Sequence, residues 1–211
     1  AKDILYVRID RRRKFHATIL LKALGNTEEK LLEYFYPFEK LDLSEVKPGE
    51  DPEAQYYYRV LDQEIFLNQR PQLPIADPKT GEVLVKSGQR INKRLLKKLE
   101  NAKVKRLNAT LHELKGRIIA RTLYKAGSEE ILVPCNTALT AELLTTLVEN
   151  DIKEVELLHI GPQNTGSTLS DTLALDKVTS PEQALIELYK KMKPGDPPTL
   201  EAAQMMLQNF F

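Results

Sequence analysis

The chain has 211 residues with 31 basic and 30 acidic side chains, a formal net charge of +1, and 42% hydrophobic residues. This balanced composition is typical of a globular protein of one or two domains and excludes extensive intrinsic disorder. No apolar run reaches the roughly 18 residues of a membrane helix, and the N-terminus lacks a signal-peptide pattern, so we expect a soluble, cytosolic protein that contacts no membrane.

The N-terminal segment predicts one strand and two helices. Residues 4–10 are rich in β-branched and aromatic side chains and predict a strand, which leads into a charged loop at 11–14. Apolar residues recur at helical spacing from Ala17 to Leu24, and Gly25 is placed to end that helix in the left-handed conformation. Thr27 is the candidate N-cap of a second helix.

The C-terminal segment predicts two more helices. Ser180 and Pro181 read as an N-cap and a first-turn proline, and Thr199 reads as the N-cap of the last helix. The proline-rich residues 193–198 between them predict a tight connector. Because the chain lacks an initiator Met and closes on apolar Phe211, we expect it to be a piece of a larger polypeptide.

An internal repeat with an offset of 48 residues lies between these helical ends. The matched pairs include Val83 with Ile131, Leu96 with Leu144, Leu99 with Leu147 and Val104 with Ile152. Each copy predicts a short strand, a polar cap (Asn92 or Thr140), a helix and a second strand. One such ββα-like unit cannot bury both of its faces, but two can close on each other.

These patterns together predict an α+β fold with a discontinuous domain. We expect residues 1–37 and 162–211 to form one mainly helical domain, interrupted by a β-rich insert at 38–161 that carries the two repeats. Insertion of this kind needs an entry and an exit that lie close together.

The sequence contains no pattern that predicts an active site. The run Gly161–Thr168 imitates a phosphate-binding loop, but Ser167 stands where the essential lysine belongs, so we interpret it as a polar turn. His16, which we expect to open a helix, and the other two histidines are isolated from further metal ligands. Cys135 has no histidine placed beside it, so we expect a packed or partly exposed thiol.

Two basic clusters are stronger candidates for a binding site. The first holds five cations within seven residues: Arg8, Arg11, Arg12, Arg13 and Lys14. Such density can neutralise phosphates; the alternative, which composition alone favours, is a surface loop whose arginines pair with acids elsewhere in the fold. The second, residues 86–106, carries nine cations and one acid, whereas its repeat partner, 134–154, carries one cation and four acids. It is either a binding face or the solvated side of a helix.

Three stretches of the chain resemble the β subunit of bacterial DNA-directed RNA polymerase. They are Tyr6–Lys14, Ala17–Leu24, and Tyr189–Thr199 with the following Glu201–Ala203. The resemblance covers the two helical ends in the correct order and implies the lobe domain of that subunit, one wall of the cleft that holds downstream DNA. The middle of the chain is similar to a lineage-specific insertion found at this point in some bacterial β subunits.

The resemblance implies a role in nucleotidyl transfer by the whole polymerase, in the bacterial cytoplasm at the nucleoid. It places the catalytic magnesium on aspartates of the β′ subunit, so we expect no catalytic residue and no cofactor in this segment. The implied partners are DNA, both the non-template strand and the downstream duplex, and the alpha, beta prime, omega and sigma subunits. The implied nucleic-acid contacts are Asp10, Arg11, Arg12 and Lys193.

One of these positions departs from the family pattern. The family commonly has arginine where this chain has Lys193, so a point-charge contact replaces a bidentate one. A second hypothesis, from a different class, is that the insert with its charge-polarised repeats is a docking module for transcription factors.

Overall fold

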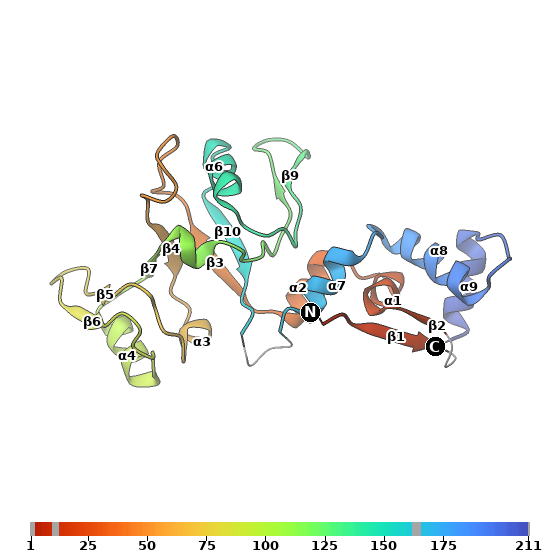
Figure 1. Ribbon diagram of the computed structural model, residues 1–211, viewed down its shortest axis with the longest axis horizontal. Helices are drawn as coiled ribbons and strands as arrows, with labels where there is room; N and C mark the ends of the chain where they lie inside the picture. The colour runs from red at the N-terminus through yellow and green to blue at the C-terminus, as the bar shows by residue number, and fades with distance from the viewer. Residues whose placement is uncertain (1–2, 10–12, 162–165, 211) are drawn as a thin grey trace. The chain divides into compact units, whose positions relative to one another are not determined.

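The computed structural model describes residues 3–9, 13–161 and 166–210 of the chain (Figure 1). These residues form an α+β fold, in which helices accompany several small antiparallel sheets. The chain divides into two compact units: a terminal unit of residues 1–36 and 160–211, and a central unit of residues 37–159. No helix of the described residues is long and apolar enough to cross a bilayer.

In the part that the structure describes, the terminal unit has a two-stranded hairpin and five helices. They are β1 (Tyr6–Ile9), β2 (Arg13–His16), α1 (Ala17–Ala23), α2 (Glu28–Phe35), α7 (Thr168–Leu175), α8 (Pro181–Met192) and α9 (Leu200–Gln208). Its core joins one face of each of α1, α8 and α9 with β2, and it includes Phe15, Ile19, Leu188 and Ala203.

Local capping signals of this unit are confirmed. The Thr27 hydroxyl accepts a hydrogen bond from the Lys30 amide at 3.3 Å, the Ser180 hydroxyl accepts from Gln183 at 3.2 Å, and Gly25 has a φ of +91°. The Thr199 hydroxyl caps α9 in the same way, accepting from the Ala202 amide at 3.2 Å. These ends are predictable because each cap satisfies a backbone group with a side chain only three residues away.

One prediction for this unit is wrong, and another ends one residue late. Arg13 and Lys14, predicted as part of a charged loop, belong to strand β2, because Phe15 is buried opposite Val7 while the hairpin pairs in antiparallel register. His16 ends β2 and is also the N-cap of α1, so the prediction that it opens a helix is confirmed. The polar turn predicted up to Thr168 is confirmed at Gly166 and Ser167, and Thr168 begins helix α7, which buries Leu169 and Leu173 on one face, four residues apart. Residues 162–165 of that turn lie outside the described residues.

The central unit is built on a four-stranded antiparallel sheet with the order β10-β3-β4-β7. Its strands are β3 (Phe38–Asp42), β4 (Tyr57–Val60), β7 (Arg106–Ala109) and β10 (Glu154–Leu158). Two small hairpins pair β5 (Ile75–Ala76) with β6 (Val83–Val85) and β8 (Leu123–Tyr124) with β9 (Ile131–Val133). The helices are α3 (Gln63–Phe66), α4 (Lys93–Asn101), α5 (Leu111–Leu114) and α6 (Ala141–Glu149).

The elements of this unit recur at a spacing of 48 residues. The series α3, β5, β6, α4, β7 is followed by α5, β8, β9, α6, β10, with the helices and both hairpins displaced by that number. Irregular backbone recurs with them: Lys103 and Asp151 follow α4 and α6 with φ of 58° and 60°. The recurrence starts at α3, upstream of the first pair that the sequence reveals.

The strands β3 and β4 form the middle of the sheet, between the two copies. Strand β4 pairs with β7 and strand β3 pairs with β10, so Arg59 lies opposite Leu107 and Leu41 lies opposite Val155. Leu41 and Arg59 are themselves cross-strand partners. Each copy has a separate hydrophobic core, in which Leu99 and Leu147 are both fully buried.

A buried ion cluster lies on β3 and β4. Glu39 is 1% exposed and accepts hydrogen bonds from Arg59 Nε and from Arg117 Nη2, the latter at 2.6 Å. Burial would raise the pKa of Glu39, but hydrogen bonds and charges from the two arginines outweigh burial and lower that pKa. Burial lowers the pKa of the neighbouring His159.

Candidate nucleic-acid interface

A hydrogen bond joins the hairpin to the end of α8. The Arg13 guanidinium donates from Nη1 to the backbone carbonyl of Met192, across 179 positions of sequence. Arg13 opens β2 and pairs with Ile9, the last residue of β1. The predicted contacts Asp10, Arg11 and Arg12 themselves lie outside the described residues.

Lys193 occupies an exposed position next to this hydrogen bond. It is the C-cap of α8, and its amide donates to the Tyr189 carbonyl at 2.8 Å. The following turn has Pro194 at its second position, Gly195 with a φ of +100° at its third, and an Asp196 amide that donates to the Lys193 carbonyl at 3.3 Å. This is the arrangement of a type II turn, which presets the direction in which Lys193 leaves the helix. The ammonium lies 5.7 Å from the centroid of the Tyr189 ring.

The remaining cations of the first cluster have different environments. Lys14 Nζ lies 3.8 Å from the centroid of the Tyr6 ring, and this ring contacts His16 at 5.3 Å between centroids. Arg8, the cross-strand partner of Lys14, is exposed. The guanidinium of Arg13 donates to a backbone carbonyl of α8, so Arg13 stabilises the fold of the terminal unit without pairing with an acid in this hydrogen bond.

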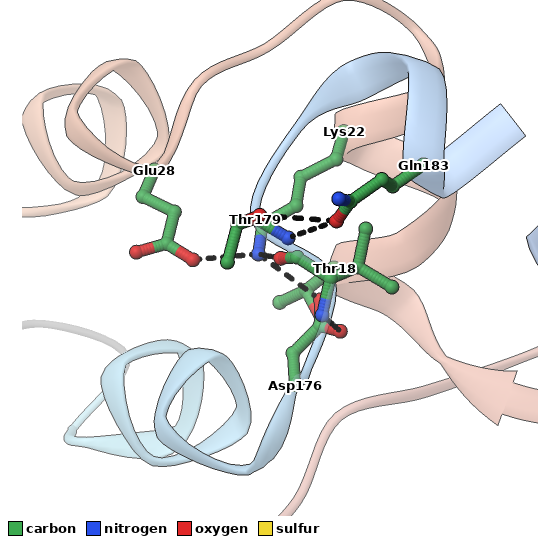
Figure 2. A network of polar contacts seen from close by, with 7 residues as sticks. Thr18, Lys22, Glu28, Asp176, Thr179 and Gln183 are labelled. Carbon is green, nitrogen blue, oxygen red and sulfur yellow. Dashed lines mark hydrogen bonds and ion pairs between the residues drawn. The ribbon is translucent and has the colours of Figure 1, made fainter.

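The sequence patterns did not reveal a buried lysine that braces the same unit (Figure 2). Lys22 of α1 is 1% exposed, and its ammonium contacts Glu28 at 2.7 Å, Asp176 at 3.2 Å and the carbonyl of Val178. Three acceptors match its three N–H donors, so the buried charge is fully satisfied. The signal for this network is present in the sequence, since Lys22 interrupts the apolar face of a helix three residues after Ile19.

A broad groove of about 880 Å³ runs beside the hairpin in the same unit. Tyr6, Lys14 and His16 line it on the hairpin side, and Gln183 and Lys190 line it on α8. Cations and acids both border this groove, so its charge does not select an anion.

The second cluster maps onto an exposed face of α4 in the central unit. Lys93, Arg94, Lys97 and Lys98 are exposed, whereas Leu96 and Leu99 on the opposite side of the helix are buried. Asn92 caps the helix by accepting from the Leu95 amide at 2.9 Å. The prediction of a helix buried through its leucines is confirmed for Leu96 and Leu99, whereas Leu95 is half-buried.

No family model matches the chain. Individual relatives do: the chain is 41% identical over 210 residues to the DNA-directed RNA polymerase subunit beta of Desulfotalea psychrophila, an alignment that covers 100% of this chain and 15% of the relative. The chain is homologous to a segment of the bacterial RNA polymerase β subunit. The same subunit of Syntrophobacter fumaroxidans is 41% identical over 210 residues, and that of Sorangium cellulosum 38% over 211 residues, with 15% and 14% of each relative covered.

These β subunits match the central unit as well as the terminal one, because each alignment covers the whole chain. These relatives therefore contain counterparts of both units. The chain spans about 15% of their length.

Proposed function

We propose that this segment forms part of the wall of the downstream DNA cleft in a bacterial RNA polymerase and contacts the non-template strand. In this role it carries no catalytic group, and the polymerase performs nucleotidyl transfer with magnesium bound by β′. The alpha, beta prime, omega and sigma subunits surround it in the bacterial cytoplasm. Its proposed nucleic-acid contacts are Asp10, Arg11, Arg12 and Lys193.

The observation that carries this proposal is the hydrogen bond from Arg13 to Met192, in a chain homologous to the β subunit. It ties the strand that follows Arg11 and Arg12 to the residue that precedes Lys193. The start of β2, directly after these residues in sequence, therefore lies beside the start of the 193–198 turn in the terminal unit. Charged groups in such turns are solvated by default and contribute little to the fold, which leaves them available to phosphates.

The test uses polymerase reconstituted with a full-length β subunit. Arg11→Ala and Lys193→Ala should each leave thermal unfolding within about 0.5 kcal/mol of wild type and shorten the lifetime of open promoter complexes. Removing one cation that neutralises a phosphate should lower the salt slope of binding by about 0.9. The matched control is Lys177→Ala, which removes an exposed lysine that lies before Ser180, the N-cap of α8, in the chain. Intact promoter complexes together with a destabilised fold would assign either residue to structure instead.

We further propose that residues 38–161 form an independently folded, duplicated insert within a helical lobe domain made of residues 1–37 and 162–211. The recurrence of elements at 48 residues supports this division. A second role, docking of transcription factors, is favoured by the β8–β9 hairpin, where the cross-strand partners Tyr124 and Ile131 are 49% and 55% exposed. Exposed apolar pairs of this kind are more typical of protein contacts than of DNA contacts.

The docking role predicts a loss of factor response without a loss of promoter binding. Polymerase carrying Tyr124→Ser and Ile131→Ser should form normal open complexes alone and respond less to a transcription factor that acts on the wild type. The equivalent hairpin of the first repeat offers a control, Val83→Ser, at a position that is 49% exposed. An equal response of both variants to every factor tested would remove this role.

A further inference from the structure

Exposed cations are concentrated on α4 and in the residues that flank it in the chain. Positions three and four apart lie on one side of a helix, which places the four α4 cations together. Four further exposed cations flank the helix in the chain: Lys86 and Arg90 before it, Lys103 and Lys105 after it. We call these four side chains, together with the four on the helix (Lys93, Arg94, Lys97 and Lys98), the α4 basic face.

The fold itself uses few of these cations. Lys98 lies 3.6 Å from Glu82, and Arg90 donates to the side-chain oxygen of Asn68 at 2.8 Å. Lys93, Arg94 and Lys97 make no ion pair with any residue in the described part of the chain. Arg106, the ninth cation of the sequence cluster, is different: it pairs with Asp42 and Glu45 and belongs to the fold.

The second repeat provides an internal comparison for the same scaffold. Helix α6 stands 48 residues after α4 and has the same length, nine residues. At the positions of Lys93, Arg94, Lys97 and Lys98 it carries Ala141, Glu142, Thr145 and Thr146. The helix therefore forms in this scaffold without any of the four cations, so the scaffold does not require them.

The cations of α4 also oppose the stability of their own helix. Lys93 and Lys97 are like charges four residues apart, as are Arg94 and Lys98, and such pairs destabilise a helix. The first turn contains cations and no acid, although the positive end of the helix dipole favours acids there, as Glu142 satisfies in α6. An arrangement that weakens its own helix points to a partner outside the fold.

Helices α4 and α6 also differ in how much of their outer face other parts of the chain cover. The β3–β4 connection packs against α6, where Val46 and Tyr57 join Leu144 in one core and border a small cleft together with Thr145. On α4 the equivalent of Thr145 is Lys97, which is exposed. The α4 basic face is thus open in the central unit, whereas its counterpart is partly covered.

We propose that the α4 basic face binds the phosphate backbone of duplex DNA without sequence preference. Its cations are mostly lysines, which act as point charges on phosphates. The exposed positions of α4 carry no aromatic side chain, so the face offers neither the stacking platform of single-strand binding nor the anchors of a protein interface. Duplex DNA is the polyanion expected beside a subunit homologous to a DNA-directed polymerase. The proposal is independent of the contacts at Arg11 and Lys193.

The test transplants residues of the second repeat onto the first. Core polymerase is reconstituted with a full-length β subunit that carries Lys93→Ala, Lys97→Thr and Lys98→Thr, the residues that α6 has at these positions. Binding to a duplex without a promoter is measured across a salt series. The slope of log K against log salt should become shallower by about 0.9 for each phosphate that is no longer neutralised, and affinity at low salt should fall several-fold.

A matched control removes three exposed lysines elsewhere in the central unit: Lys47→Thr, Lys115→Thr and Lys153→Thr. The control should keep the wild-type slope. An unchanged slope in the α4 variant, or an equal change in the control, overturns the proposal. A photoreactive amino acid at Lys97 in the wild-type background gives a second readout that does not depend on the triple variant: cross-linking to duplex DNA is expected. Cross-linking only to protein, or only to single-stranded nucleic acid or RNA, contradicts it.

Discussion

Replacing Glu39 with alanine should destabilise the central unit by about 3 to 5 kcal/mol, because it strands two partly or fully buried arginines. Arg59, with a side chain 10% exposed, would keep only the Gln69 side-chain oxygen at 2.9 Å and the face of the Phe66 ring. Arg117, with a side chain 19% exposed, would keep a long hydrogen bond of 3.4 Å to the carbonyl of Leu158. Since the guanidinium of Arg117 is exposed enough for water to solvate it in part, we expect the loss of stability to lie in the lower half of that range.

A second variant separates charge from volume. Glu39→Gln keeps the size of the side chain and one acceptor oxygen but removes the negative charge between the arginines. We expect it to cost about 1.5 to 3 kcal/mol, the usual contribution of a hydrogen bond to a charged group. The order of stability should therefore be wild type, Glu39→Gln, Glu39→Ala.

Native-state hydrogen exchange of the 211-residue chain measures this loss where it occurs. The slowest amides of β3 and β4, such as that of Leu41, report the opening of the central unit, and those of α8 in the terminal unit serve as an internal control. A change below about 1 kcal/mol in both variants would refute the reasoning, since buried charged hydrogen bonds contribute more than this. So would an equal loss of protection at α8, because the cluster lies entirely in the other unit.

The same cluster predicts how stability depends on pH. The folded-state pKa of Glu39 is lowered, so its contribution is present above the ordinary glutamate value of about 4.3 and is lost as the pH falls through the lower folded value. The pKa of His159 is also lowered in the folded state, so the chain loses stability at this residue in a higher pH range, as the pH falls below about 6.5. Below about pH 4.5, wild type should therefore lose more stability than Glu39→Gln, as measured by urea denaturation.

Three further predictions concern packing and independence of the units. Leu96→Ala and Leu144→Ala, at equivalent positions that are 5% and 1% exposed, should each cost about 2 to 5 kcal/mol in denaturant unfolding; a loss of amide protection that spreads equally over both copies would argue against separate cores. Lys22→Ala should destabilise the terminal unit by about 3 to 5 kcal/mol in thermal unfolding, because it leaves the buried Asp176 carboxylate without its ammonium, and Lys22→Met should cost nearly as much if charge rather than volume decides. Residues 38–161 expressed alone should unfold in one cooperative transition, and a gradual, non-cooperative loss of circular dichroism would contradict their independence.

Local patterns determined much of the helical structure. Thr27, Ser180, Thr199, Asn92 and Thr140 were all readable as N-caps, because a cap depends on a side chain and an amide three residues apart. The 48-residue repeat was readable for the same reason, since it records which positions of a short element are apolar. Asp62 and Thr110, the caps of α3 and α5, carry the same offset and could have extended the repeat upstream.

Only the tertiary structure decided how the distant segments meet. The four-residue strand β2 is indistinguishable from a charged loop until Phe15 packs against the helices and the strand pairs with β1. Strands β3 and β4 lie between the two copies in the sheet, and the 48-residue repeat in the sequence does not indicate this pairing. Local sequence likewise contains no sign that Arg13 reaches Met192, or that Glu39 lies between Arg59 and Arg117. These contacts join residues 20 to 179 positions apart, and their partners are selected by burial and charge in the folded chain, which no short window of sequence records.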